Sequence, residues 1–474
     1  MTAERDHAAG LERLFELERV EGDGDAVVVE GALPAGLRGV AYWNGPGAAG
    51  RGDLRYRHWL DGDGLVAALR FGEQRTRFAS RFVQSTKRVE EEAAGRALYR
   101  TFGTRFAGDR LQMGLGLASP VNVSVYPFAG HLLAFGEQGL PWALDLETLE
   151  TRGEHTFLGA LNAVSPFSAH PAYDRASGEM FAFGVSFAAA APLVHLYRFD
   201  AAGGLARRAR VPLPFACSIH DFGLSARHAL LYASPYLLDA AALLRDGRTV
   251  QESLAWRPEL GSRLIVVRRD DFTPVGEVAL GQRYCLHWIN AFEDGDTLVA
   301  DVVELDRPVY DQYEVLPDLF RAVAPGRPAR LRIDLATLTL IDRVELDYDR
   351  APDFPVVAAA DAGRAYSRCT MLGISATGSP GRKFFDELAA VDWSAGAVET
   401  WRAPPGAYFA SEPVHVPSAS GAGHLVCLSF DTRSATTSGW IFDAGRVGDG
   451  PLARLALPHA VPALFHGVWE PASR

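Results

Sequence analysis

Short runs of apolar residues, each about as long as a β-strand, recur along the whole chain between polar turns. One pattern returns six times: an apolar run, an aspartate, a turn and a second apolar run, as in ARLRIDLATLTLIDRVEL. An aspartate before Gly, Thr or Ser favours a tight turn because its carboxylate can bond the backbone just downstream. The pattern predicts β-hairpins that turn at Asp145, Asp200, Asp271, Asp334, Asp392 and Asp443.

The spacing of these aspartates predicts the architecture. Successive members are 55, 71, 63, 58 and 51 residues apart. Each interval has room for about four strands and their turns. Radially repeated four-stranded sheets form a β-propeller, which protects its strand edges by closing a ring. The sequence therefore predicts an all-β fold, a seven-bladed β-propeller formed by residues 1–474 as a single domain. A large irregular β-sandwich is the alternative, but it gives no reason for the regular hairpin.

Helices have a minor part in this prediction. The 47 glycines and 28 prolines interrupt nearly every window in which a long helix could form. One helix is predicted over EEEAAGRALYRTF, residues 90–102.

Composition and charge exclude several classes of protein. The chain has 474 residues, 48% of them hydrophobic and 22% charged, which is typical of a globular protein. The formal net charge of −11 and the scattered basic residues argue against a nucleic-acid partner. The four cysteines lie too far apart for a zinc ribbon, an iron–sulfur site or a disulfide framework. No signal peptide or membrane-spanning run is visible, which predicts a reduced, cytoplasmic protein.

Four of the thirteen histidines stand where an apolar strand meets a turn. They are 50, 67 and 179 residues apart, so they form no local ligand motif. Each one alone is better explained as a hydrogen-bonded core histidine. As a group on a radial fold, strand ends from different blades could bring them to the axis, and four neutral imidazoles suit Fe, Cu, Zn or Ni. The candidate metal ligands are His170, His220, His287 and His466.

Three acidic residues have apolar neighbours and could hold the second nitrogen of a ligating imidazole. They are Glu137 in LLAFGEQGLPW, Asp353 in APDFPVV and Glu412 in YFASEPVHVP. Each one alone is better explained as a solvated acid at a strand end. Together with the four histidines, these acids support the hypothesis of a tetra-histidine metal site. Spacing and chemistry alone do not establish that site.

The chain resembles the carotenoid cleavage oxygenase family over almost its whole length. The matching stretches, in the family's order, are residues 29–47, 57–71, 131–154 and 168–184, followed by IHDFGLS, HWINAFEDGD and FHGVW. The resemblance implies a seven-bladed propeller whose axis carries a ferrous iron held by four histidines. Capping loops and short helices over that axis would form a hydrophobic tunnel. It also implies an enzyme, a non-haem Fe(II) dioxygenase that splits a C=C double bond with O₂ into two carbonyl products.

Position by position, the resemblance implies that the ligands of Fe(2+) are His170, His220, His287 and His466. It implies that Glu137 and Glu412 hold two of these rings. The third carboxylate of the family is normally a glutamate in an E-F-P context, where this chain has Asp353. Because aspartate is one methylene shorter, we expect it to reach its histidine, His287, through water or a backbone shift.

The resemblance also bears on the substrate. Relatives that cleave hydroxystilbenes have a lysine just before the first outer glutamate, and this chain has Gly136 there. Without that cation the tunnel has less reason to favour a phenolate, which favours a carotenoid or apocarotenoid. Val123 stands where many relatives have threonine beside the iron, and Leu60 where an aromatic residue is frequent. The predicted cavity residues are Leu60, Val123, Gly136, Trp288 and Phe354.

A carotenoid must come out of a membrane, so an apolar tunnel rim and contact with a membrane surface are expected. The segment 234–247 is a candidate, with an exposed patch formed by Leu237, Leu238, Leu243 and Leu244. A helix packed on the propeller explains the same segment equally well.

The leading hypothesis is an iron dioxygenase that acts on O₂ and a hydrophobic polyene, a carotenoid or apocarotenoid. A stilbenoid-cleaving dioxygenase and a retinoid-type isomerase or hydrolase on the same iron scaffold are the alternatives. A propeller without enzymatic activity, acting as an interaction scaffold, gives no reason for four histidines in the family's order.

Overall fold

The structure is a computed structural model that describes residues 10–113, 116–187, 191–312, 315–316, 326–375, 384–418 and 421–472. Antiparallel sheets form most of it, and five of them have four strands in chain order. They are β9 (Ser124–Phe128), β10 (His131–Phe135), β11 (Trp142–Leu144) and β12 (Thr151–Glu154); β13 (Ala172–Asp174), β14 (Glu179–Ser186), β15 (Leu193–Phe199) and β16 (Leu205–Pro212); β17 (Gly223–Leu224), β18 (His228–Ala233), β21 (Ser262–Arg268) and β22 (Pro274–Gly281); β23 (Tyr284–Asp294), β24 (Thr297–Leu305), β25 (Gly326–Asp334) and β26 (Thr339–Glu345); and β27 (Asp353–Val356), β28 (Arg368–Gly373), β29 (Glu387–Asp392) and β30 (Ala397–Arg402).

A ten-stranded sheet joins the two ends of the chain. Its strands are β1 (Gly22–Gly31), β2 (Gly39–Pro46), β5 (Gly64–Phe71), β6 (Thr76–Phe82), β31 (Ala407–Phe409), β32 (Val414–Val416), β33 (His424–Asp431), β34 (Thr436–Asp443), β35 (Pro451–Ala456) and β36 (Gly467–Pro471). The first half of β1 pairs with β6 and the second half with β35. The last strand, β36, pairs with β2 near the start of the chain. This pairing closes the ring, because both termini contribute strands to the same sheet.

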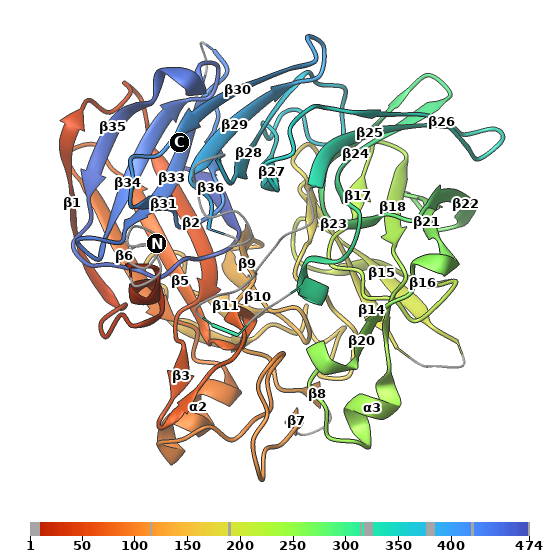
Figure 1. The fold of residues 1–474 in the computed structure, drawn as a ribbon, viewed down its shortest axis with the longest axis horizontal. Helices are drawn as coiled ribbons and strands as arrows, with labels where there is room; N and C mark the ends of the chain where they lie inside the picture. Colours follow the sequence, from red (N-terminus) through yellow and green to blue (C-terminus); the bar gives the residue numbers. More distant parts are fainter. Residues whose placement is uncertain are drawn as a thin grey trace, which may run out of the picture.

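The sheets surround a central axis, so the chain has an all-β propeller-like fold (Figure 1). Strands β9, β17, β23, β27 and β36 face the middle of the ring (Figure 1). Apolar side chains fill the space between neighbouring sheets; for example, Leu230 and Val266 pack in one cluster with Trp288 and Leu331 of the next sheet. This packing fixes the inner strands relative to one another, and these strands position the site described below.

The six aspartates of the sequence pattern lie where the structure turns between neighbouring strands. Five of them end or directly follow β11, β15, β25, β29 or β34, while Asp271 lies within the turn between β21 and β22. In each case the next strand is the outer one of the pair. The Asp145 carboxylate accepts a 2.8 Å hydrogen bond from the Thr148 backbone N–H, and Asp334 accepts the equivalent bond from Thr337. These bonds hold the pKa of both carboxyls below the usual range. The predicted hairpins are therefore confirmed. In successive sheets, each aspartate lies at the turn that leads into the outer strand.

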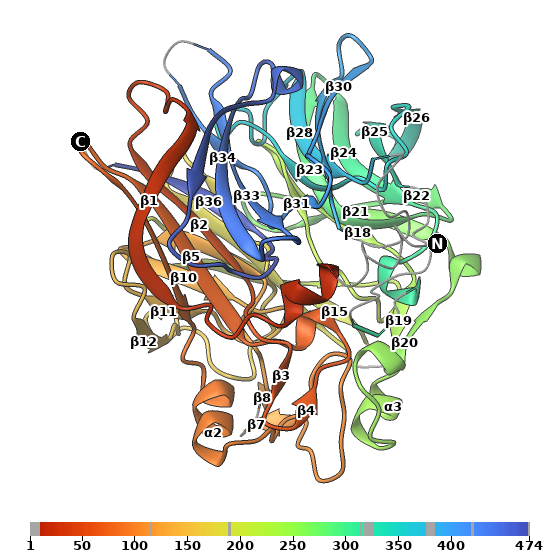
Figure 2. The ribbon, with the colours of Figure 1, turned by 60° about the vertical axis from the view of Figure 1, so that its left-hand side comes forward.

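Short elements gather on one side of the sheets (Figures 1 and 2). They are β3 (Gly50–Arg51), β4 (Leu54–Arg55), β7 (Gln112–Met113), β8 (Gly116–Leu117), β19 (Tyr236–Leu238), β20 (Leu254–Trp256), α2 (Thr86–Ala94) and α3 (Ala240–Leu244). Short 3₁₀ turns accompany them at Arg13–Phe15, Trp59–Asp61, Gln251–Ser253, Pro258–Leu260 and Val309–Gln312, whereas the turn Val447–Asp449 packs against β30. The loops between these elements form a cap.

The helix predicted over residues 90–102 exists, but its bounds were wrong. Helix α2 starts after Ser85, whose hydroxyl caps it by accepting a bond from the Arg88 N–H. It ends at Gly95, which takes the left-handed conformation with φ 63°. A glycine in this conformation is a common helix stop, because it lacks the Cβ that makes the conformation costly.

The predicted patch of four exposed leucines was also wrong. Leu238 belongs to β19 and Leu243 to α3, and both are buried, being 8% and 4% exposed. Only Leu244 of the four is largely exposed, at 61%. The alternative of a short helix packed on the propeller describes this segment better. Among the described residues, no helix is long and apolar enough to cross a membrane.

Candidate metal centre

The four histidines singled out in the sequence lie at or near the starts of inner strands. His170 precedes β13, His220 precedes β17 and His466 directly precedes β36, while His287 lies near the start of β23. These strands belong to four different parts of the ring, and their early ends point to the same place on its axis. The radial fold therefore joins residues that the sequence separates.

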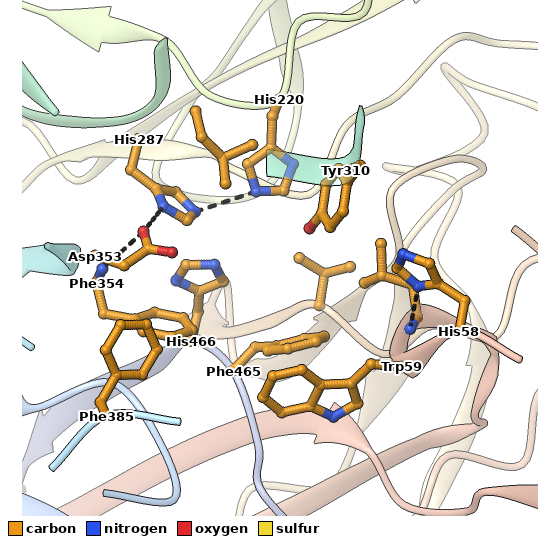
Figure 3. A pocket seen from close by; sticks show the side chains of 13 residues that line it. His58, Trp59, His220, His287, Tyr310, Asp353, Phe354, Phe385, Phe465 and His466 are labelled. Atoms are coloured by element: carbon orange, nitrogen blue, oxygen red, sulfur yellow. Dashed lines mark hydrogen bonds and ion pairs between the residues drawn. The ribbon is translucent and has the colours of Figure 1, made fainter. Parts of the chain in front are cut away.

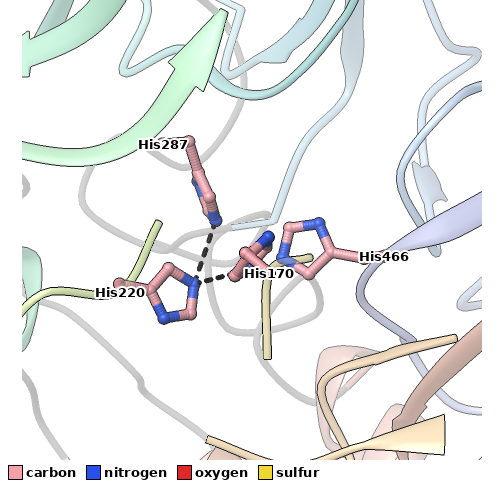
Figure 4. A group of neighbouring side chains, drawn as sticks. All are labelled: His170, His220, His287 and His466. Carbon is pink, nitrogen blue, oxygen red and sulfur yellow. Dashed lines mark hydrogen bonds between the residues drawn. The ribbon is translucent and has the colours of Figure 1, made fainter. Parts of the chain in front are cut away.

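The ring nitrogens of these histidines form one compact cluster (Figure 4). One nitrogen from each ring lies within 4.8 Å of the others. His220 Nε2 is 2.9 Å from His170 Nε2 and 3.2 Å from His287 Nε2. Nitrogens that bind one first-row metal ion at about 2.1 Å, at right angles, lie about 3 Å apart. The cluster therefore fits a metal ion bound by neutral imidazoles.

Carboxylates hold the outer nitrogens of three of these rings. Glu137 Oε2 lies 2.8 Å from His220 Nδ1. Asp353 Oδ1 lies 2.5 Å from His287 Nδ1, and Glu412 Oε1 lies 3.4 Å from His466 Nδ1. A carboxylate at Nδ1 keeps that nitrogen protonated, so the lone pair on Nε2 faces the centre of the cluster.

The shorter Asp353 reaches its ring directly, without the intervening water considered from the sequence. It opens β27, whose register against β28 shifts between Asp353 and Val356. The next residue, Phe354, has a φ of 52°, in the left-handed region that non-glycine residues rarely occupy. This irregular backbone accompanies the short contact.

His170 has a different neighbour, Asp221, which belongs to the IHDFGLS stretch but was not predicted to have a role. The nearest carboxylate to its Nδ1 is Asp221, at 4.0 Å. The Phe222 and Trp288 N–H groups donate to the two oxygens of Asp221 at 2.7 and 2.8 Å. Asp221 therefore ties the segment that carries His220 to the strand that carries His287. The available signal in the sequence was that Asp221 directly follows His220, a candidate ligand.

Burial sets the protonation of the cluster. Burial lowers the pKa of His170, and the neighbouring imidazoles lower it further. Burial likewise lowers the pKa of His287 to about 4, although Asp353 opposes the shift. For His220 burial acts in the same direction, but the charge and hydrogen bond of Glu137 outweigh it and raise the pKa. Two of the rings are thus held in the neutral form that metal binding requires.

Two neighbouring cavities adjoin the cluster on the cap side. The smaller one, of about 40 Å³, lies directly against His220, His287 and His466 (Figure 3). The larger one, of about 370 Å³, shares Leu60, His220, Leu286 and Tyr310 with it. Carbon atoms form most of both walls, so the cavities suit an apolar ligand.

Three of the five predicted cavity residues line these spaces. Leu60, Val123 and Phe354 all border the smaller cavity, and Val123 is also bonded through its carbonyl to the His466 N–H at 3.3 Å. Six further residues complete this wall and were not predicted from the sequence: His58, Trp59, Leu286, Tyr310, Phe385 and Phe465. His58 and Trp59 adjoin Leu60 in the HWLDGDG stretch, which was the available signal.

Trp288 and Gly136 are not among the described residues that line either cap-side cavity. Trp288 borders a separate cavity of about 1290 Å³, together with Asp221 and Glu412. A Cβ on Gly136 would lie 2.2 Å from Ser119 Oγ, so a side chain here requires Ser119 to move. The backbone at Gly136 is therefore packed against a neighbouring loop.

The fold and the cluster together define a class of protein, the propeller oxygenases that hold a metal ion with histidines alone. Comparison with known proteins agrees. Residues 16–471 match the family described as retinal pigment epithelial membrane protein. The chain belongs to this family, to which the carotenoid cleavage oxygenases also belong, and the resemblance seen in the sequence is confirmed.

Individual relatives extend over nearly the whole chain. The chain is 32% identical to apocarotenoid-15,15′-oxygenase of Synechocystis sp., over 93% of this chain and 92% of that protein. It is 26% identical to isoeugenol monooxygenase of Pseudomonas nitroreducens, over 96% of each chain. It is also 26% identical to lignostilbene-α,β-dioxygenase isozyme III of Sphingomonas paucimobilis, over 98% of each. The solved structure of the cobalt-substituted Synechocystis oxygenase superposes with a TM-score of 0.89 at 28% identity, over 98% of both chains.

Replacing Asp353 tests the direct contact with His287. Asp353→Asn removes the charge, and we expect metal affinity to fall about 10- to 100-fold, as for other carboxylates that hold a ligating histidine. Asp353→Glu is the matched variant that restores the family's residue. We expect it not to raise affinity, because Asp353 is only 4% exposed and already in contact. Titration with Co²⁺, followed by its visible absorption, measures both; tighter binding by the glutamate variant contradicts the prediction.

Proposed function

We propose that this protein is a non-haem Fe(II) dioxygenase that cleaves a C=C double bond of a carotenoid or apocarotenoid with O₂ to give two carbonyl products. The observation that supports this most directly is the convergence of four imidazoles beside an apolar cavity. The relative with the highest sequence identity quoted above is named an apocarotenoid oxygenase. His170, His220, His287 and His466 would hold the ion.

The donor set suits iron, as it suits Cu, Zn and Ni, and the family resemblance supports iron among them. No cysteine lies in the cluster, and the four described cysteines are buried and free. Four neutral ligands leave a divalent ion its full charge. When bound, ferrous iron supplies the redox chemistry that lets O₂ react with a double bond.

The side chains around the ion bind and orient. Glu137, Asp353 and Glu412 keep three rings in the required tautomer. Trp59, Phe354 and Phe465 present aromatic faces to the cavity (Figure 3), which bind a flat polyene and exclude water. No described side chain needs to act as a nucleophile.

We further propose that the chain is a single seven-bladed domain. The ten-stranded sheet divides at β1 into two groups of strands. One group is β36-β2-β5-β6. The other is β33-β34-β35 together with β31 and β32, two short strands that both pair with β33, so each group has about the size of a four-stranded sheet. Added to the five four-stranded sheets, they make seven blades, with β1 joining the first to the last. We also propose that substrate is delivered from a membrane surface. The four predicted leucines do not form the contact with that surface, because Leu238 and Leu243 are buried.

A substrate panel tests the reaction. Iron-loaded protein is incubated with apocarotenals, carotenoids and hydroxystilbenes, and the aldehydes are identified by mass. We expect cleavage of the polyenes, because Gly136 supplies no cation for a phenolate. Turnover of hydroxystilbenes alone favours the stilbenoid-cleaving alternative. Two of the relatives quoted above support that alternative, because their names, isoeugenol monooxygenase and lignostilbene-α,β-dioxygenase, refer to small aromatic substrates.

The same reaction run in ¹⁸O₂ separates cleavage from isomerisation or hydrolysis. We expect label in the aldehyde products. Products without oxygen from ¹⁸O₂ favour a retinoid-type isomerase or hydrolase, and purified protein that retains no metal favours an interaction scaffold.

A further inference from the structure

The wall of the larger cap-side cavity is mainly apolar, and three of the polar groups on it are phenols. Leucine, isoleucine, valine and phenylalanine side chains form much of its wall. Tyr236, Tyr284 and Tyr310 interrupt that wall. They come from β19, β23 and the 3₁₀ turn Val309–Gln312, three segments that only the tertiary structure brings together.

These hydroxyl groups have no hydrogen-bond partner in the part of the chain that the structure describes. Two buried tyrosines elsewhere are paired with carboxylates: Tyr232 donates to Glu304 Oε1 at 2.6 Å, and Tyr348 donates to Glu387 Oε1 at 2.9 Å. The buried Tyr56 hydroxyl, by contrast, also has no partner among the described residues. Tyr236 and Tyr284 are only 2% and 4% exposed. A buried polar group without a partner is costly, so whatever fills this cavity is expected to offer hydrogen bonds to it.

The three phenols line a cavity that His220 also lines. The rings of Tyr236 and Tyr284 meet edge to face, with centroids 6.1 Å apart. Tyr310 borders both cap-side cavities, as His220 does. Its hydroxyl points into the space in front of the histidines (Figure 3). An oxygen atom bound here would belong to a molecule that also reaches the metal centre.

The surroundings favour a neutral oxygen. Burial raises the pKa of all three tyrosines far above the ordinary value, so each remains a protonated donor. Glu137 raises the pKa of Tyr284 and Tyr310 further. The negative charge of Glu137 disfavours an anion such as a phenolate or carboxylate, and Arg100, which also lines this cavity, is paired with Asp109 at 2.7 Å. A hydroxyl or carbonyl oxygen, in contrast, can accept from a phenol.

We propose that Tyr236, Tyr284 and Tyr310 form a subsite that hydrogen-bonds a neutral oxygen of the substrate, and that the preferred polyene carries a hydroxyl or carbonyl group. This inference rests on the proposed function, which by itself does not separate hydrocarbon from oxygenated polyenes. These tyrosines select the substrate and are given no part in breaking its double bond.

Three matched substrates test the subsite: a polyene hydrocarbon, the apocarotenal of the same chain length, and its ring-hydroxylated analogue. We expect higher kcat/KM for the oxygenated compounds. Tyr310→Phe, Tyr236→Phe and Tyr284→Phe each remove one hydroxyl, and at least one should lower kcat/KM for the oxygenated compounds about three- to tenfold, mainly through KM. The hydrocarbon should be unaffected. Tyr126→Phe, in the separate cavity, is the matched control.

Two results would overturn the subsite. One is equal kcat/KM of the unaltered protein for hydrocarbon and oxygenated polyenes. The other is an equal loss for all substrates in the phenylalanine variants, which indicates a purely structural role. If the unaltered protein cleaves none of them, the proposed function fails, and binding of the same compounds, followed by quenching of tryptophan fluorescence, still decides whether the hydroxyls recognise oxygen.

Discussion

His220→Ala is expected to lose bound iron, and oxygenase activity with it, while the propeller stays folded. His220 is central to the cluster, because its Nε2 lies within 3.2 Å of two other ligand nitrogens. The variant also leaves Glu137 without its partner. The hydrophobic packing between sheets does not depend on this ring, and a fold of this size does not need one metal ion for stability.

Metal analysis after reconstitution with ferrous iron measures the first effect, and circular dichroism with a thermal melt measures the second. His131→Ala is the matched control, since His131 opens β10 and lies outside the four-histidine cluster. The control should keep about one iron per chain. Unchanged iron content in His220→Ala contradicts the proposed metal centre.

Lys87→Met is expected to have the largest effect on stability, a loss of about 3–5 kcal/mol. Lys87 Nζ lies 2.9 Å from Asp63 Oδ1 and 2.8 Å from Glu91 Oε2, and all three side chains are fully buried. Methionine fills a similar volume but leaves two carboxylates facing each other in a buried site. Arg51 and Arg88 also pair with Asp63, which offsets only part of the loss.

Chemical denaturation measures this change, provided that unfolding is two-state. Glu92→Gln on the same helix is the control, because the Glu92 side chain is 51% exposed and pairs with Arg88 near solvent. We expect it to cost no more than about 1 kcal/mol. A loss in Lys87→Met no greater than in the control would show that the buried network contributes little.

The same network has a functional consequence. Asp63 lies three residues after Leu60, in the stretch whose His58, Trp59 and Leu60 line the cavity. Asp61, also buried, accepts bonds from the Gly103 N–H at 2.8 Å and from the Thr104 hydroxyl. Helix α2 and the following loop therefore hold one wall of the cavity. This role was not visible in the sequence, where α2 was predicted only as a helix.

Local chemistry explains which predictions were correct. A turn aspartate acts on backbone groups two or three residues away, so Asp145 and Asp334 could be recognised without knowing the fold. The helix bounds were wrong because the Gly95 stop was read as an interior residue. The leucine patch was wrong because burial of Leu238 and Leu243 depends on what packs against them.

The sequence by itself determined the repeating hairpin, the strand-end positions of the four histidines and the supply of acids to hold them. Only the tertiary structure decided which partners meet. Glu137 lies 83 residues from His220, and Asp353 lies 66 residues from His287. Such pairs form because packing between sheets fixes the directions of distant inner strands, and no local preference of the chain encodes those directions. The same reason placed Trp288 in a different cavity and brought three tyrosines to the wall of the larger cap-side cavity.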